Sequence, residues 1–76
     1  MNRITLTLPA DDRADDRTRE RTRAIDAIRA LEAYDAEESA RFFVALRAAD
    51  TLQLGATYYR ALAGLVDRAY RAEVAR

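Results

Sequence analysis

YYRALAGLVDRAYRAEV, residues 58–74, is the stretch that decides the fold of this chain. Its apolar residues recur at steps of three and four, so they form one stripe along an α-helix. Gly64 interrupts this helix at a cost of about 1 kcal/mol relative to alanine, and we expect close approach of another helix to explain it. The stripe consists of Tyr59, Leu62, Val66, Tyr70 and Val74, widened by Tyr58, Leu65 and Ala69.

An earlier segment shows the same helical spacing. Ile25, Ile28 and Leu31 share one face, because residues three and four apart lie together on a helix. Neighbouring positions extend this apolar face: Ala24, Ala27 and Tyr34.

A third helix is predicted between these two segments. Asp35 and Glu38 have the spacing of a capping box, which begins a helix. Asp50 and Gln53 repeat this pattern more weakly, and Gly55 also favours a break near residues 50–55. The expected buried face of this third helix contains Phe42, Phe43, Leu46 and Ala49. We therefore expect helices over roughly residues 11–34, 36–50 and 54–75.

The segment from Pro9 to Arg23 is dominated by charge and contains no side chain that we expect to anchor a core. We interpret it as a solvated or fraying helix in which Asp16–Arg19 and Glu20–Arg23 pair at i,i+3. Disorder and a hairpin strand remain alternatives.

The first residues show a different period. Arg-Ile-Thr-Leu-Thr-Leu, residues 3–8, alternates polar and apolar side chains as a half-buried β-strand does, and Pro9 ends it. A single strand leaves its backbone groups unpaired, so Ile4, Leu6 and Leu8 are predicted to form an assembly strand. The expected fold is mainly α: a small two- or three-helix bundle, residues 10–76, with an N-terminal β-strand or extended arm, residues 1–9.

The residue inventory argues against catalysis. Without cysteine or histidine there is no thiolate, histidine base or Cys/His zinc site, so we predict no enzyme and no metal or other cofactor. Ser39, the only serine, has no base to activate it. Four aspartates form an acidic cluster, interpreted as a solvated helix end because arginines interleave with it: Asp11, Asp12, Asp15 and Asp16.

Composition and charge indicate the source of the chain and its cellular compartment. All 13 basic residues are arginine, and 17 residues are alanine, which is typical of a GC-rich bacterium or its phage. The formal net charge is zero, which disfavours nonspecific nucleic-acid binding. Residues 1–16 lack the apolar region of a signal peptide, and no apolar run approaches 20 residues. These features predict a cytoplasmic protein without membrane association.

The sequence therefore predicts a non-catalytic protein–protein interaction or regulatory module, such as an inhibitor or adaptor. A protein partner or a homo-oligomer is expected, and no small-molecule substrate. The predicted contacts are the N-terminal strand and exposed aromatic side chains, because aromatic residues are common interface anchors. The candidate aromatic residues are Tyr34, Phe42, Phe43, Tyr58, Tyr59 and Tyr70. Within each adjacent pair, we expect one ring to be buried and one to lie at the core margin.

An alternative function follows from a resemblance. The Arg-x-Thr-x-Thr pattern before Pro9 resembles the N-terminal ribbon of ribbon-helix-helix repressors and antitoxins, and residues 38–44 resemble the start of that family's second helix. The resemblance implies a dimer that contacts DNA through Arg3, Thr5 and Thr7. The chain departs from the family pattern because about fifteen residues, ten of them charged, separate its strand from the first amphipathic helix.

Overall fold

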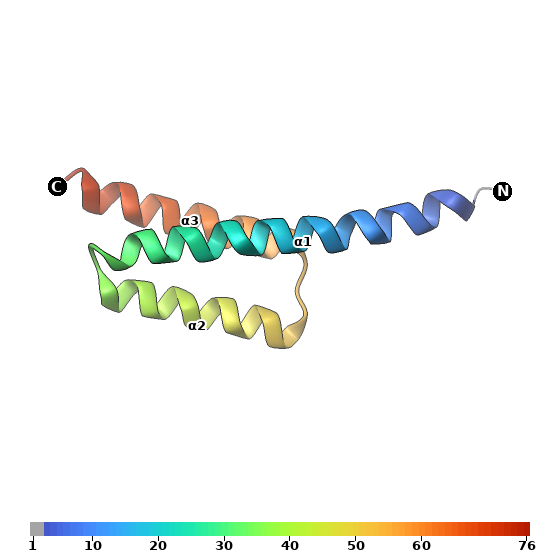
Figure 1. Cartoon of the computed structure of the whole chain (residues 1–76). Coiled ribbons are helices and arrows are strands. Elements are labelled where there is room, and N and C mark those ends of the chain that lie inside the picture. The colour runs from blue at the N-terminus through green and yellow to red at the C-terminus, as the bar shows by residue number, and fades with distance from the viewer. Residues whose placement is uncertain (1–2) are drawn as a thin grey trace.

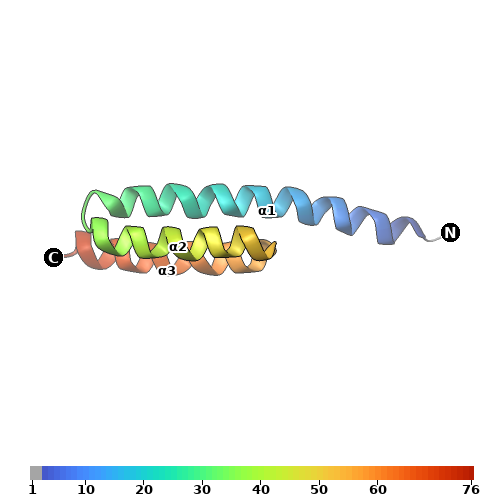
Figure 2. The ribbon, with the colours of Figure 1, turned by 90° about the horizontal axis from the view of Figure 1, so that it is seen from below.

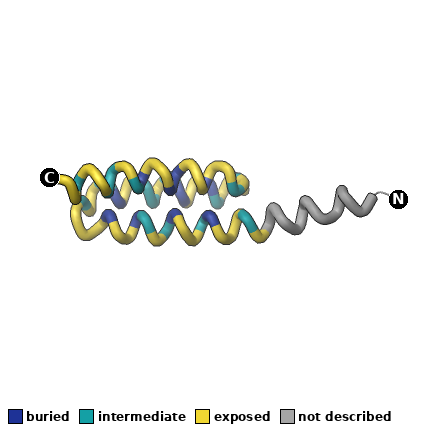
Figure 3. The backbone as a smooth tube through the Cα atoms, turned by 90° about the horizontal axis from the view of Figure 1, so that it is seen from above, coloured by how far each residue is buried: buried dark blue, intermediate teal, exposed yellow. Residues whose placement is uncertain are grey.

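The computed structural model contains three α-helices joined by two short connections (Figure 1). They are α1 (Arg3–Glu32), α2 (Ala36–Leu52) and α3 (Ala56–Val74). The structure describes residues 15–76 with their side chains (Figure 3). Over this range the chain is a compact, mainly α domain without strands, which confirms the helical fold class and defines it as a three-helix bundle. The predicted strand or arm, residues 1–9, lies outside the described residues.

The helices run alternately along a common axis. α1 and α3 run in the same direction and α2 runs opposite to both, as two perpendicular views show (Figures 1 and 2). α1 packs against both other helices, most extensively against α3. Each connection is short enough to place consecutive helices side by side, as in an up-down-up bundle.

The core lies along the inner faces of the three helices (Figure 3). On α1 it uses one residue per turn, and the same helical spacing selects the core positions of α2 and α3. Burial of these apolar side chains is the main force that stabilises the bundle. The buried residues are Ala24, Ile28 and Leu31 on α1, Leu46 and Ala49 on α2, and Tyr59, Leu62, Ala63 and Val66 on α3.

The start of α2 agrees with its predicted cap. Asp35 is the N-cap, and its carboxylate accepts a hydrogen bond of 3.0 Å from the backbone N–H of Glu38. The Glu38 carboxylate instead accepts a 2.6 Å hydrogen bond from Arg41. One half of the capping box is therefore present, and it satisfies one of the N–H groups that every helix N-terminus leaves without a partner.

The break between α2 and α3 also falls where the sequence predicts it, but Asp50 does not cap a helix. Gln53 ends α2 in the left-handed conformation (φ 57°), and Gly55 is the N-cap of α3. Asp50 lies inside the last turn of α2. The capping interpretation is wrong because side chains of α1 and α3 bind this carboxylate.

Two further expectations are corrected by the fold. Residues 17–23 are helical, so they do not form a hairpin strand. Gly64 is exposed, and a Cβ built on it would meet no atom of another helix within 4 Å. Close approach of another helix therefore does not explain this glycine.

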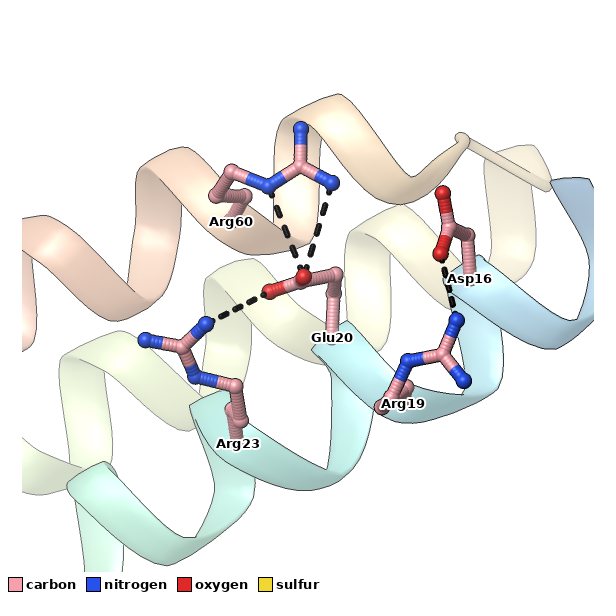
Figure 4. Close-up of polar contacts among 5 residues, drawn as sticks. All are labelled: Asp16, Arg19, Glu20, Arg23 and Arg60. Carbon is pink, nitrogen blue, oxygen red and sulfur yellow. Dashed lines mark hydrogen bonds and ion pairs between the residues drawn. The ribbon is translucent and has the colours of Figure 1, made fainter.

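Glu20 shows that the charged part of α1 contributes to packing after all. Glu20 is only 8% exposed. One of its carboxylate oxygens lies 3.4 Å from Arg23 on the same helix, and the other lies 3.4 Å from Arg60 on α3 (Figure 4). Asp16 and Arg19 pair at 2.6 Å on the exposed side. Both predicted i,i+3 pairs are therefore confirmed, and Glu20 also links α1 to α3.

A buried hydroxyl links α1 to α2. The Ser39 side chain is 2% exposed and donates a 2.9 Å hydrogen bond to the backbone carbonyl of Ile28. Since a buried hydroxyl without a partner is costly, this bond favours the observed level of α2 along α1. The Ser39 hydroxyl therefore has a structural partner in the backbone of α1.

Candidate functional site

An apolar groove of about 540 Å³ lies between α1 and α2. We call it the α1/α2 groove. Its lining residues on α1 are spaced at one helical turn, and those on α2 lie within two turns, so the groove follows the helix axes. The apolar part of this lining consists of Ile25 on α1 and Ala40, Phe43, Val44 and Leu46 on α2.

Most of these apolar groups are incompletely covered. Val44 is 68% exposed, whereas Ile25 and Phe43 are partly buried against the core. Leu46 belongs to the core itself. The groove therefore offers an apolar surface that is continuous with the interior of the bundle, which is typical of surfaces that bind partners.

The rim of the groove is basic. Arg21, Arg29 and Arg47 line it, and none of its lining residues carries a carboxylate. Arg21 is bound to Asp50, whereas Arg29 and Arg47 form no ion pair with any residue of the described range 15–76. Two arginines without an ion pair in this range therefore border an apolar surface.

Arg21 also borders a second, polar cavity of about 380 Å³. Its Nε and Nη2 atoms donate hydrogen bonds of 2.9 and 2.8 Å to the two oxygens of Asp50, in a bidentate arrangement. The Tyr59 hydroxyl donates a further hydrogen bond to Asp50. Side chains of all three helices thus meet at one carboxylate. The cavity is lined by Arg17, Thr18, Arg21, Thr22, Asp50, Gln53 and Tyr59.

These contacts change the acidity of the groups in a defined direction. Hydrogen bonds from Arg21 and Tyr59 lower the pKa of Asp50 to about 2. The bond to Asp50 raises the pKa of Arg21. Burial, followed by the bond to Asp50, raises the pKa of Tyr59. Near neutral pH the network therefore holds an ionised carboxylate, a cation and a neutral phenol.

This network predicts an acid-dependent part of the stability. Because the folded pKa of Asp50 is depressed, its contribution is present above the unfolded value of about 3.9 and is lost as the pH falls from about 5 to 2. Asp50 is about one-third exposed, so we expect solvent screening to limit the loss to about 1 kcal/mol. Urea unfolding of the wild type and Asp50→Asn should show their difference in free energy of unfolding shrinking over this range.

Asp26→Asn is the matched control for this measurement, because Asp26 is exposed and has no ion pair within residues 15–76. Its difference from the wild type accounts for the general loss of one negative charge. If the Asp50→Asn and Asp26→Asn differences follow the same course between pH 5 and pH 2, the assigned role of Asp50 is incorrect.

The candidate aromatic residues differ in how far they are buried. Tyr59 is 1% exposed and belongs to the core, so it is not part of a contact surface, whereas its neighbour Tyr58 is exposed. Phe42 and Phe43 are both partly buried, so neither ring is the fully buried member that we expected of that pair. Only Phe43 among the six lines the α1/α2 groove.

Tyr34 and Tyr70 lie at a different place on the bundle. Their ring centroids are 5.4 Å apart in an edge-to-face arrangement, with Tyr34 exposed and Tyr70 partly buried. The aromatic residues therefore do not form one continuous patch. The predicted contact residues do not include Arg29, Arg47 and Val44, which line the groove. Arg21 lies in the arginine-rich run of residues 17–23, whose charge is compatible with phosphate or an acidic protein partner.

Several predicted positions lie outside the described residues: the assembly strand Ile4, Leu6 and Leu8 and the DNA contacts Arg3, Thr5 and Thr7. Within residues 15–76, no three acidic side chains gather in a way that would hold a metal ion. In the same range no helix combines the length and apolar character needed to cross a bilayer.

Comparison of the chain with protein-family models, with curated protein sequences and with solved structures finds no match. The groove and the Asp50 network are therefore interpreted from their own geometry and chemistry.

Proposed function

We propose that this protein is a non-catalytic protein–protein interaction or regulatory module, and that the α1/α2 groove is its docking surface. The observation that carries the proposal is the exposed apolar lining of the groove, in which Val44 is 68% exposed. A partner side chain that covers this lining removes apolar area from water, which supplies roughly 25 cal/mol per Å² before the costs of association.

The chemistry of the polar cavity supports a non-catalytic role. Asp50 is committed to Arg21 and Tyr59, and its low pKa makes it a weak proton acceptor near neutral pH. The raised pKa of Tyr59 keeps its phenol protonated. Both groups are therefore better suited to joining the three helices than to acid–base catalysis.

Site-specific photo-crosslinking tests the docking surface. A benzoylphenylalanine in place of Val44 should yield a discrete crosslinked protein in the cells that produce this chain. The same group in place of Leu65, which is 51% exposed on α3, should not. Both positions are exposed and within helices, so incorporation should leave the bundle folded.

A blocking variant makes the test specific. Ala40→Gln extends a neutral side chain into the groove and should reduce the crosslink at position 44 at least about tenfold, equivalent to about 1.4 kcal/mol of binding energy. Ala61→Gln, on the exposed side of α3, is its control. Equal crosslinking from positions 44 and 65, or no effect of Ala40→Gln, would contradict docking in the groove.

A further inference from the structure

The charges around the α1/α2 groove indicate what kind of partner it accepts. Arg29 and Arg47 are exposed, line the groove and have no ion pair within residues 15–76. A partner that brings carboxylates to these arginines gains attraction, whereas a basic partner meets repulsion. The apolar floor formed by Phe43 and Val44 offers nothing to a phosphate backbone, so charge and lining together favour a polypeptide.

The course of the helices indicates the shape of that partner. Residues 21, 25 and 29 follow one another at four-residue steps on α1, and residues 40, 43, 44 and 47 follow helical steps on the antiparallel α2. The eight residue steps from Arg21 to Arg29 extend about 12 Å along the axis, or about two turns. A straight groove of this length between two helices fits the apolar ridge of a third helix.

The antiparallel course also distributes the charges. It places Arg29 toward the end of the groove near Ala40, and Arg47 toward the end near Arg21. Since Arg21 is bound to Asp50, Arg29 and Arg47 are the cations available to a ligand, one toward each end.

From these observations we infer that the groove binds an acidic amphipathic helix of a partner protein. This inference rests on the proposed docking function and adds the chemical class of the ligand. The partner places apolar side chains at i, i+3/i+4 and i+7 along the groove. Its carboxylates flank this ridge and pair with Arg29 and Arg47.

Three labelled peptides test the inference by fluorescence anisotropy with the full-length protein. They share one helical sequence with a leucine ridge and differ only in the flanking residues, which are glutamate, glutamine or lysine. The glutamate peptide should bind about 3- to 10-fold more tightly than the glutamine peptide, because two exposed ion pairs are added. The lysine peptide should bind least, and salt should reduce the differences.

A charge exchange assigns the selectivity to the two arginines. The double variant Arg29→Glu/Arg47→Glu should prefer the lysine peptide over the glutamate peptide. Arg68→Glu/Arg71→Glu changes two exposed arginines of α3 that have no ion pair within residues 15–76, and it should keep the wild-type preference. Circular dichroism of each variant checks that the helices persist.

The outcomes separate this inference from the proposed function. Equal binding of all three peptides would overturn the acidic partner and leave the groove as a docking surface. If none of them binds, and position 44 gives no specific crosslink, both proposals fail. Sedimentation that shows a dimer dissociated by Val44→Asp would instead assign the groove to a second copy of the chain and would overturn the acidic partner.

Discussion

Ile28→Ala should destabilise the bundle by about 2–5 kcal/mol, the range for an isoleucine truncated in a packed core. Ile28 is completely buried, and its carbonyl accepts the Ser39 hydrogen bond, so the surrounding helices have little freedom to close the cavity. A 76-residue domain has a total stability of about 4–11 kcal/mol at 0.05–0.15 kcal/mol per residue. The variant should therefore lose a large fraction of its stability, and thermal or urea denaturation followed by circular dichroism would measure the loss.

Ile25→Ala provides the comparison for this substitution. It makes the same chemical change one helical turn earlier, at a residue that is only partly buried and lines the groove. Ile25→Ala should lower the free energy of unfolding by less than half as much as Ile28→Ala, because part of the Ile25 side chain already contacts water. Equal costs at the two positions would show that the described core is misassigned.

Asp50→Ala is expected to cost about 2–3 kcal/mol, because it removes the common partner of Arg21 and Tyr59. The Tyr59 hydroxyl would remain in a site where the residue is 1% exposed, and a buried polar group without a partner costs about 1–3 kcal/mol. Tyr59→Phe should cost about 1 kcal/mol, since Asp50 keeps its bidentate bond to Arg21.

A double-mutant cycle isolates this interaction. In the Tyr59→Phe background, Asp50→Ala no longer leaves a phenol unpaired, so the two costs should be less than additive by at least about 1 kcal/mol. Asp26→Ala combined with Tyr59→Phe should be additive, because Asp26 is exposed and does not contact Tyr59. Additivity of Asp50→Ala and Tyr59→Phe within about 0.3 kcal/mol would refute the predicted coupling.

The sequence predicts the helices well because their signals are local. The three- and four-residue spacing identifies Ile28, Leu62 and Val66 as buried, and Asp35 identifies the start of α2. The predicted stripe of α3 is too wide, because Tyr58, Leu65 and Val74 are exposed. Each of these signals depends on residues within one or two turns of the same helix.

The polar contacts between helices could not be predicted in the same way. Asp50 binds Arg21, 29 residues earlier, and Glu20 reaches Arg60, 40 residues later. Such pairs depend on how the helices are arranged in space, which periodicity along one helix does not specify. The same limit applies to the α1/α2 groove, because its lining combines residues that appear in the sequence as parts of two separate amphipathic faces.

The two ends of the α1/α2 pair are held by contacts of different length. Near the connection between the helices, Ser39 reaches the Ile28 backbone through a single short side chain, whereas the far end is joined by the long side chain of Arg21 to Asp50. A short hydroxyl bond tolerates little separation, but an arginine can follow its carboxylate through several rotamers. We therefore expect the two ends of the pair to differ in how much separation between α1 and α2 they tolerate.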